Sequence, residues 1–247
     1  MKTIINRRTI RKYSNRELSE ELLKQLLSEA ERTPTMGNLQ LYSVIITRSA
    51  GNKRKLAPAH FHQPMVENAP VVLTFCADFR RTTLWAKARK GNPGYDNFLS
   101  FLNAATDALI YCQTFCNLAE TKGLGTCFLG TTIYQPQPII DALELPPLVF
   151  PVATITLGYP DENPPQPDRL PLEAIIHEET YTDYTPERIN QFYDAKENLE
   201  ENKRFVELNQ TETLAQIFTD IRYKKSDNEV LSASLLKALE QQGFLTL

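Results

Sequence analysis

Four stretches of the chain have the residue pattern of β-strands. Each is a run of β-branched, aromatic and other apolar residues, and glycine, proline or aspartate stands at most of their ends. The four runs are residues 42–48 (YSVIITR), 71–78 (VVLTFCAD), 126–129 (TCFL) and 150–160 (FPVATITLGYP). The run at 71–78 is apolar almost throughout, which predicts a strand in the core of the protein.

Other stretches have helical periodicity. Residues 19–34 place leucines 22, 23, 26 and 27 on one stripe, with Ser19 as the expected N-cap and Pro34 as the stop. Residues 98–122 contain neither proline nor glycine and have apolar side chains on most faces, so we expect a central helix buried on nearly all sides. Further helices are expected within 51–59, 138–145, 186–204, 211–220 and 228–242.

The stretches between these elements indicate how the chain is organised. We expect residues 60–70 to be irregular, and the polar, basic and turn-rich stretch 79–97 to form a surface excursion. A proline-rich stretch follows the last strand, and the chain becomes more polar and helical from Thr185 onward. We therefore expect one domain, with a core at residues 1–184 and a helical C-terminal extension at 185–247 packed on it.

The composition is that of a globular protein. The 247 residues are 42% apolar and 23% charged, with a formal net charge of −3, and they are enough to bury a sizeable core. No stretch approaches the roughly 18 unbroken apolar residues of a membrane helix, and the N-terminus lacks the apolar segment of a signal peptide. We expect a cytoplasmic protein without a membrane partner. The mild acidity also argues against a nucleic-acid partner.

Cysteine and histidine give no sign of a disulfide framework or a metal site. Cys76, Cys112, Cys116 and Cys127 lie inside apolar runs, so we expect them to be reduced and buried. The three histidines form no HExxH motif, and no metal site is expected.

A cluster of positive charge near the N-terminus is the first candidate for chemistry. Arg7, Arg8, Arg11 and Lys12 fall within six positions of a chain that is acidic overall. Two interpretations fit the cluster taken alone. It is either the solvated end of a helix, where positive charge is favourable, or a local site for an anion.

Three motifs resemble those of a known family. Residues 7–40 (RRTIRKYSNRELSEELLKQLLSEAERTPTMGNLQ), 122–130 (KGLGTCFLG) and 157–181 (LGYPDENPPQPDRLPLEAIIHEETY) follow one another in the chain. In this order they resemble the signatures of the FMN-dependent nitroreductase family, in the group of NAD(P)H nitroreductases and flavin reductases with a C-terminal helical extension. The resemblance implies an α+β fold, with a central mixed, mainly antiparallel sheet flanked by helices, in an intertwined homodimer.

The resemblance implies that the arginine cluster binds FMN. Arg7, Thr9 and Arg169 match positions that hold the FMN phosphate, and guanidinium forks and a hydroxyl suit a phosphate dianion. Arg8 matches a position facing the ribityl chain and the ring, with a solvated side chain as the alternative. Arg11 matches the position at the N1 and O2 edge of the flavin, where a cation stabilises the charge that accumulates on reduction. A surface role for Arg11 is the alternative.

A loop and a strand exit match further FMN contacts of the family. The loop that covers FMN from the partner subunit corresponds to Pro34, Thr35, Met36 and Asn38. The segments near the flavin ring correspond to Gln63, Phe128, Leu129 and Gly130. Met36 stands where related sequences often carry serine, so a backbone amide would have to replace that hydroxyl. Gly130 permits a close backbone approach to flavin N5. The alternatives are a tight turn at Asn38 and a core strand that ends at Gly130.

The implied activity is ping-pong hydride transfer. NAD(P)H reduces FMN, and a nitroaromatic, a quinone or free flavin then takes the hydride, so the expected partners are small planar electron acceptors. No catalytic side chain is required, and none is predicted. One alternative is a flavin-binding protein without turnover, with a regulatory or storage role. Another is a structural helical protein whose arginines lie on the surface.

NADPH is expected to be preferred over NADH as the co-substrate. The 2′-phosphate that distinguishes NADPH requires cations near the adenosine ribose. In similar enzymes these lie in the C-terminal extension, which here contains Lys203, Arg204, Arg222, Lys224 and Lys225. The alternative is that both basic groups are solvated helix ends.

Overall fold

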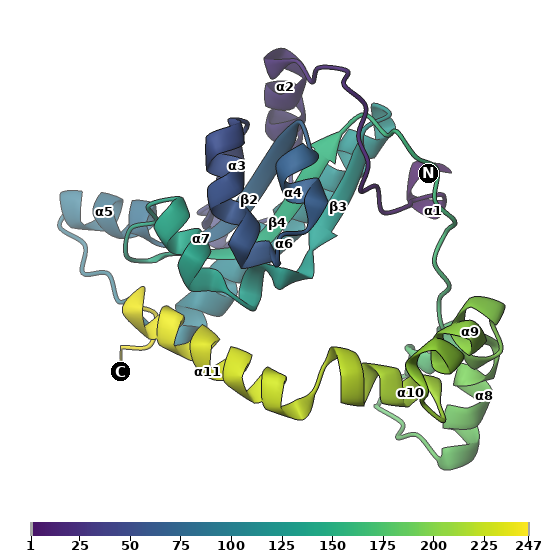
Figure 1. The fold of residues 1–247 in the computed structure, drawn as a ribbon. Helices are drawn as coiled ribbons and strands as arrows, with labels where there is room; N and C mark the ends of the chain where they lie inside the picture. Colours follow the sequence, from purple (N-terminus) through teal and green to yellow (C-terminus); the bar gives the residue numbers. More distant parts are fainter. Residues whose placement is uncertain (1, 247) are drawn as a thin grey trace. The chain divides into compact units, whose positions relative to one another are not determined.

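The computed structural model describes residues 2–246 (Figure 1). The chain forms two compact units. The first runs to Pro165 and also includes the chain from Leu231 onward, whereas the second comprises Gln166–Val230. The expected division at residue 184, between an FMN-binding core and an extension, stays a prediction.

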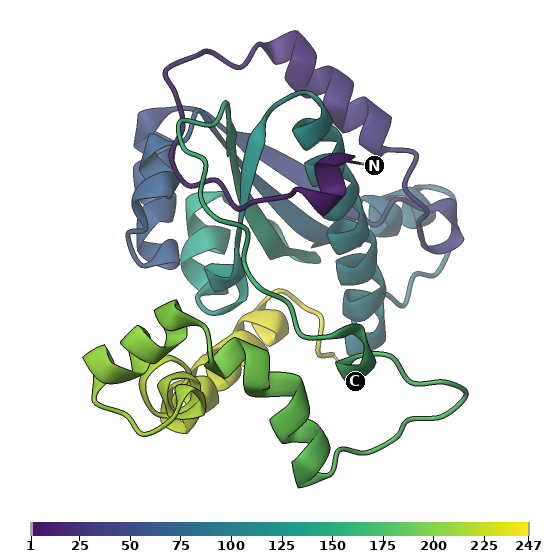
Figure 2. The same ribbon diagram turned by 90° about the vertical axis from the view of Figure 1, so that its right-hand side faces the viewer.

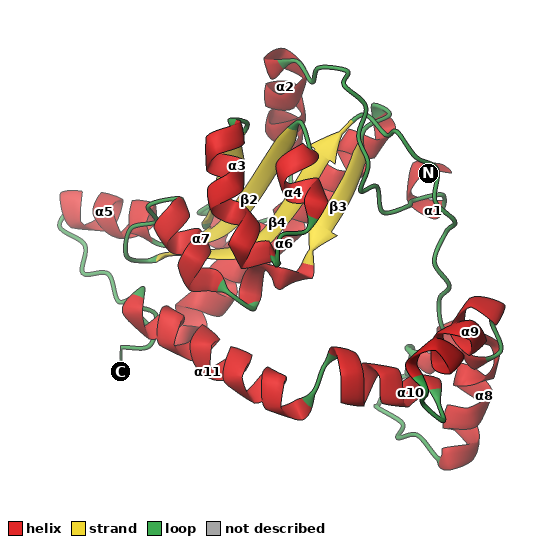
Figure 3. Cartoon of the chain, viewed as in Figure 1, coloured by secondary structure: helices red, strands yellow, loops and turns green. Residues whose placement is uncertain are grey.

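A four-stranded antiparallel sheet forms the centre of the first unit (Figure 3). Its strands are β1 (Tyr42–Thr47), β2 (Val71–Asp78), β3 (Gly125–Leu129) and β4 (Val149–Gly158), in the order β1-β2-β4-β3. Phe75 of β2 lies opposite Val44 of β1 and Ala153 of β4. The four expected strands and the α+β fold are confirmed.

Side chains of β2 alternate between two apolar cores, one on each face of the sheet. Leu73 and Phe75 belong to the larger core, together with α2 (Glu20–Ala30) and α6 (Phe98–Thr121). Val72 belongs to the smaller core, which also contains residues of α3 (Ala50–Leu56), α4 (Pro64–Asn68) and α7 (Pro136–Ala142). Because helices cover both faces, every residue of β2 and β4 is buried, as the apolar sequence of β2 predicts.

The expectation that the long helix is buried on nearly all sides is wrong for the single chain. One side of α6 packs on the sheet and on α2. The other side exposes a stripe of large apolar residues, namely Phe98, Leu99, Leu102, Leu109 and Ile110, each at least 40% exposed. Apolar residues on most faces of a helix therefore do not establish burial within one chain, because a second molecule can cover the remaining face.

The capping expected for α2 is confirmed at its start. Ser19 Oγ accepts a hydrogen bond from the backbone N–H of Leu22 at 3.1 Å. The helix ends at Ala30, before Pro34, and Thr33 Oγ1 donates to the Ala30 carbonyl at 2.7 Å. Proline thus limits the helix, but a threonine hydroxyl closes its last turn.

Two connecting stretches are more helical than expected. Residues 60–70 contain α4, which begins at Pro64, a residue favoured in the first turn of a helix. The surface excursion 79–97 contains α5 (Arg80–Ala88), on which Trp85 is 59% exposed. The expectation of irregular structure at 60–70 is therefore wrong, whereas the exposure expected at 79–97 is confirmed.

The N-terminal segment lies along the outer edge of β3 after the short helix α1 (Lys2–Ile5) (Figure 2). The backbone N–H of Ile10 donates to the Thr126 carbonyl at 3.0 Å, and Tyr13 forms an isolated antiparallel bridge with Pro160. We call residues 6–13 the N-terminal strap. It gives hydrogen-bond partners to an edge strand that has β4 on its other side.

Helices dominate the second unit. They are a 3₁₀ helix (Leu172–Ala174), α8 (Pro186–Glu197), α9 (Glu200–Asn209), α10 (Leu214–Gln216) and a π-helix (Ile217–Arg222), and the unit also holds the start of α11 (Lys225–Gln241). The single helix expected at 186–204 is two helices, because the first ends at Glu197 and the second begins at Glu200.

Two further features of the chain are its cysteines and the apolar character of its helices. All four cysteines are buried and free of disulfides. Within residues 2–246, no helix combines the length and the apolar character that a membrane crossing needs.

Candidate functional site

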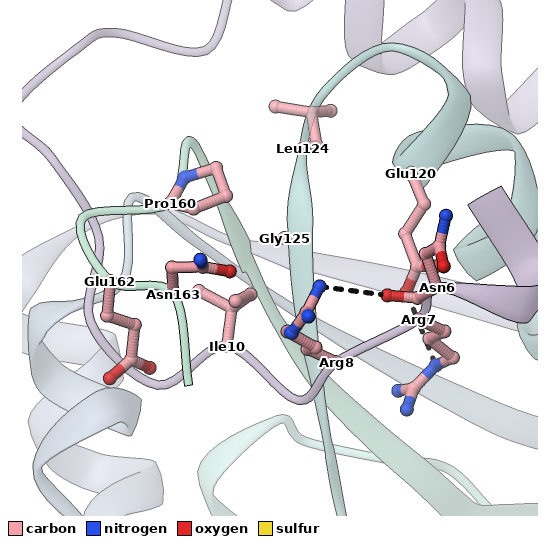
Figure 4. A pocket seen from close by; sticks show the side chains of 10 residues that line it. All are labelled: Asn6, Arg7, Arg8, Ile10, Glu120, Leu124, Gly125, Pro160, Glu162 and Asn163. Carbon is pink, nitrogen blue, oxygen red and sulfur yellow. Dashed lines mark hydrogen bonds and ion pairs between the residues drawn. The ribbon is translucent and has the colours of Figure 1, made fainter. Parts of the chain in front are cut away.

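A cavity of about 390 Å³ opens beside the N-terminal strap in the first unit (Figure 4). Four segments line it: the strap, the end of α6, the start of β3 and the chain that follows β4. The lining residues are Asn6, Arg7, Arg8, Ile10, Glu120, Leu124, Gly125, Pro160, Glu162 and Asn163. Two arginines of the N-terminal cluster therefore face a common cavity.

Ile10 fixes the strap against the sheet. Its side chain is buried over Gly125, where an added Cβ would come within 2.6 Å of Ile10. Glycine at position 125 is thus required for this close approach. Tyr13 Oη adds hydrogen-bond contacts to the Ile10 carbonyl at 2.7 Å and to Thr156 Oγ1 at 2.6 Å. The backbone that carries the arginines is consequently held on both sides of Ile10.

Arg7 forms an ion pair inside the cavity. Its Nε lies 3.3 Å from Glu120 Oε1, and the two side chains are 27% and 10% exposed. Thr126 Oγ1 donates to the same carboxylate oxygen at 3.2 Å. Burial raises the pKa of Glu120, while the charge of Arg7 and the hydroxyl of Thr126 oppose the rise. The cavity thus contains a carboxylate that is held by two partners.

Arg8 has a buried donor without a partner. Its Nη1 donates to the Asn6 carbonyl at 3.4 Å, but its Nε is buried and finds no acceptor within residues 2–246 (Figure 4). Leaving a buried N–H unpaired costs about 1–3 kcal/mol. The described residues therefore leave one donor of this guanidinium unsatisfied.

Glu162 closes the other end of the strap. Its carboxylate accepts hydrogen bonds from the backbone N–H groups of Arg11 and Lys12, the latter at 3.0 Å. The Arg11 bond is the main reason that the pKa of Glu162 is lowered. Burial raises the pKa of Cys127 on β3, and the positive charge of Arg11 opposes the rise.

A buried aspartate holds the loop predicted to cover FMN. Asp107 of α6 is 2% exposed, and its carboxylate accepts from the backbone N–H groups of Met36 at 2.9 Å and Leu41 at 3.1 Å. Between these anchors, Gly37 and Asn38 have φ values of 55° and 54°. The tight turn considered for Asn38 is therefore present, and the Met36 amide is engaged by Asp107.

Sequence reasoning missed Asp107, although a signal was available. It is the only acidic residue between Phe98 and Ala119, within an otherwise apolar and neutral helix. A charge at such a position is rarely buried unless it is paired or hydrogen-bonded.

A buried histidine connects the two segments predicted to lie near the flavin ring. His60 Nδ1 is 2.8 Å from Thr131 Oγ1, which follows Gly130 at the exit of β3. The backbone N–H of Gln63 donates to the His60 carbonyl at 3.1 Å. At the strand exit, Phe128 is 47% exposed whereas Leu129 is buried. The core-strand interpretation of this segment is thus correct for Leu129.

The predicted residues are distributed over both units. Arg7 and Arg8 line the cavity, and the half-buried Thr9 follows them in the chain. Arg169 lies in the second unit, where it is exposed and its Nη1 donates to the Asp168 carbonyl at 2.8 Å. Its role at the phosphate stays a prediction.

Comparison with known proteins decides the family. The profile of the nitroreductase family matches residues 4–159. The chain belongs to the nitroreductase family. An FMN reductase (NAD(P)H) of Bacillus subtilis strain 168 is 29% identical over 255 residues, covering 99% of this chain and 97% of the relative. An FMN reductase (NADPH) of the same strain is 30% identical over 183 residues, covering 73% of this chain and 74% of the relative.

Solved structures share the fold along the whole length of this chain. A crystal structure from Bacteroides fragilis NCTC 9343 superposes with a TM-score of 0.98 at 60% identity and covers 100% of both chains. NfrA2 of B. megaterium gives a TM-score of 0.85 at 30% identity and covers 100% of this chain and 98% of its own. The family and the fold inferred from the three motifs are confirmed.

Proposed function

We propose that this nitroreductase-family protein is an FMN-dependent NAD(P)H oxidoreductase that reduces small planar acceptors by ping-pong hydride transfer. Nitroaromatics, quinones and free flavin are the acceptor classes. The observation that carries the proposal is the cavity that both Arg7 and Arg8 line, where Arg8 Nε is buried without an acceptor among the described residues. Relatives named as FMN reductases support it.

The residues present fit the phosphate and ribityl portions of FMN. Arg7 and Arg8 provide guanidinium groups, and Thr9, the next residue, provides a hydroxyl; these are the donor types suited to phosphate. The family motif assigns Arg169 to the same phosphate. Bound FMN would supply a ring nitrogen that accepts a hydride from NAD(P)H and passes it to the acceptor.

Arg11 would provide fixed positive charge at the pyrimidine edge of the ring. Glu162 holds the backbone of Arg11, so this position on the strap is rigid. A preorganised cation stabilises negative charge without the cost of reorganising solvent. Gln63 and residues 128–130 would contact the ring, and the backbone N–H of Gly130 would lie near the hydride-accepting atom. No side chain is required to transfer a proton.

We also propose a homodimer, with Pro34, Thr35, Met36 and Asn38 of one subunit covering the FMN of the other. The exposed apolar stripe of α6 supports association, since single domains rarely leave such a surface uncovered. The loop is anchored on the same helix through Asp107. Sedimentation that shows a stable monomer with tightly bound FMN would rule this out.

NADPH is proposed as the preferred co-substrate. Among the basic residues of the second unit, the Arg222 guanidinium lies 4.5 Å from the centroid of the Phe205 ring. Arg222 is therefore packed on an aromatic ring rather than simply solvated, and such packing fixes the guanidinium in place. Lys225 lies 3.9 Å from Glu229, as expected of a solvated helix end. We assign the contact with the 2′-phosphate of NADPH to Arg222.

We also propose that the protein is located in the cytoplasm.

An anaerobic reduction tests the proposed function. The purified protein should be yellow, and NADPH should bleach it under nitrogen, with colour restored by a quinone. A protein that binds FMN but is bleached by neither NADPH nor NADH is instead a flavin-binding protein without turnover. A colourless protein that gains no thermal stability from added FMN is not a flavoprotein.

A further inference from the structure

Glu120 places a carboxylate in the cavity that is proposed to bind the anionic phosphate of FMN. It lies next to the end of α6, and its carboxylate contacts Arg7 Nε at 3.3 Å. Like charges repel, and the C-terminal end of a helix is itself the negative end of the helix dipole. Charge alone would therefore disfavour a glutamate here.

Two contacts hold this carboxylate in one orientation. Arg7 Nε and Thr126 Oγ1 both lie on Glu120 Oε1, and Thr126 is fully buried on β3. The ion pair restricts rotation of the Arg7 side chain, because Nε belongs to the rigid guanidinium plane. Glu120 therefore has two effects of opposite sign: it orients Arg7, and its charge opposes a phosphate.

A second carboxylate of the cavity serves as a comparison. Glu162 also lines the cavity, but its oxygen accepts from the backbone N–H groups of Arg11 and Lys12. It has the same charge as Glu120 and a different partner. The contact to the Arg7 guanidinium is what distinguishes Glu120.

We propose that Glu120 is a positioning residue that orients Arg7 toward the FMN phosphate and, through its charge, keeps FMN binding weak enough for exchange with free FMN. This inference rests on the proposed function, in which the cavity takes the FMN phosphate. Orientation and repulsion are separable, because glutamine keeps the shape and hydrogen bonding of glutamate without its charge. Alanine removes both.

The test compares FMN with riboflavin, which lacks the phosphate, by equilibrium dialysis of the full chain. Glu120→Gln should lower the Kd for FMN by about tenfold, because a unit charge near a partly buried phosphate is weakly screened. Glu120→Ala also loses the orientation of Arg7, so its Kd for FMN should lie about tenfold or more above that of Glu120→Gln. The Kd for riboflavin should stay within about twofold of the parent value in both variants, since neither effect acts without a phosphate. Glu120→Gln that binds FMN no more tightly than the parent overturns the proposal.

Glu29→Gln is the matched control, because it removes the same charge at an exposed position of α2 outside the cavity. It should change the Kd for FMN by less than about twofold, since salt screens an exposed charge. Equal tightening in both glutamine variants would show that only net charge matters and would overturn the role assigned to Glu120. Thr126→Val, which keeps the charge of Glu120 but removes one of its two partners, should raise the Kd for FMN by about threefold. An unchanged Kd in that variant would contradict the positioning role.

The experiment also separates this inference from the function on which it rests. A parent chain that binds neither flavin overturns the proposed function, and the inference falls with it. A parent chain that binds FMN and riboflavin equally well overturns the phosphate site. If the parent prefers FMN and the variants do not differ from it, only the role of Glu120 is wrong.

Discussion

His60 Nδ1 lies 2.8 Å from Thr131 Oγ1, so one hydrogen bond joins the turn before Gln63 to the turn at Gly130. The imidazole is fully buried, and its Nε2 has no partner within residues 2–246. Burial lowers the pKa of His60 to about 4, because a charged imidazole would lose its solvation. Between these two pKa values, the His60 imidazole is thus neutral in the folded protein and protonated in the unfolded chain.

We predict a loss of stability in mild acid that depends on His60. The unfolded state takes up a proton below a pKa of about 6.5 and the folded state only below about 4, so stability is present above pH 6.5 and decreases toward pH 4. From pH 7 to pH 5, this group should reduce the free energy of unfolding by about 2 kcal/mol. Urea unfolding of the parent and of His60→Gln at both pH values measures the difference. His62→Gln, which alters an exposed neighbour, should retain the full decrease, and an equal decrease in His60→Gln would contradict the assignment.

The phosphate site predicts a specific loss of FMN affinity. Arg7→Ala and Arg169→Ala should each weaken FMN binding by about 1.5–3 kcal/mol, roughly ten- to a hundredfold, because each removes a charge-assisted hydrogen bond. Fluorescence titration with FMN measures the change. Arg32→Ala, at an exposed position of the connection after α2, should bind FMN like the parent. Parent-like affinity in both phosphate-site variants would show that the site is misplaced.

Arg11 should affect the flavin potential more than flavin retention. Arg11→Ala removes the cation proposed at the pyrimidine edge, so the midpoint potential of bound FMN should become more negative by about 30 mV or more. The affinity for oxidised FMN should change less than in Arg7→Ala. Spectroelectrochemical titration of the two holoenzymes tests this. An unchanged potential in Arg11→Ala assigns the residue to the surface.

Asp107 should control the order of the loop at residues 36–41. Asp107→Asn offers one acceptor oxygen instead of two, and we expect it to lose about 1–3 kcal/mol of stability because one backbone N–H is left without its partner. The loop should also be cleaved faster by limited proteolysis. Asp141→Asn is the matched control, since Asp141 is exposed and its carboxylate accepts only from Gln137 among the described hydrogen bonds. Equal proteolysis of the two variants would show that Asp107 does not anchor the loop.

The exposed stripe of α6 predicts how the dimer can be broken. Leu109→Glu places a charge on this apolar face and should shift the protein toward the monomer at micromolar concentrations, with loss of FMN on dilution. Analytical ultracentrifugation at several concentrations measures the monomer fraction and, through the flavin absorbance, the FMN that sediments with the protein. Ser28→Glu, which adds the same charge to an exposed position of α2, should leave the assembly as it is. A Leu109→Glu variant that sediments like the parent excludes this face from the interface.

The sequence was informative where local pattern determines structure. The apolar run at 71–78 became β2 with the same bounds, because proline and aspartate limit it and both its faces are covered. The cap at Ser19 was also predictable from residue type and position. The α5 helix was missed because charged residues interrupt its apolar spacing, and local pattern gives little weight to such a stretch.

Contacts between distant parts of the chain were not predictable in the same way. The family motifs indicated that Arg7 and Arg11 belong to the site, but neither Glu120 nor Glu162 follows from a local pattern. The Arg11 amide and Glu162 are 151 residues apart, and only the fold brings them together. A single sequence also gives no sign of which side of α6 faces the sheet, so the exposed stripe was read as buried.

The N-terminal strap has a consequence for solubility. By bonding to the Thr126 carbonyl through Ile10, it occupies the free edge of β3, which would otherwise be open to pairing with the edge of another molecule. The same residues carry the arginines of the cavity. Detachment of the strap would thus disrupt the cavity and expose the unpaired edge of β3 at the same time. A molecule whose strap has detached would therefore both lose its ligand and be prone to aggregate.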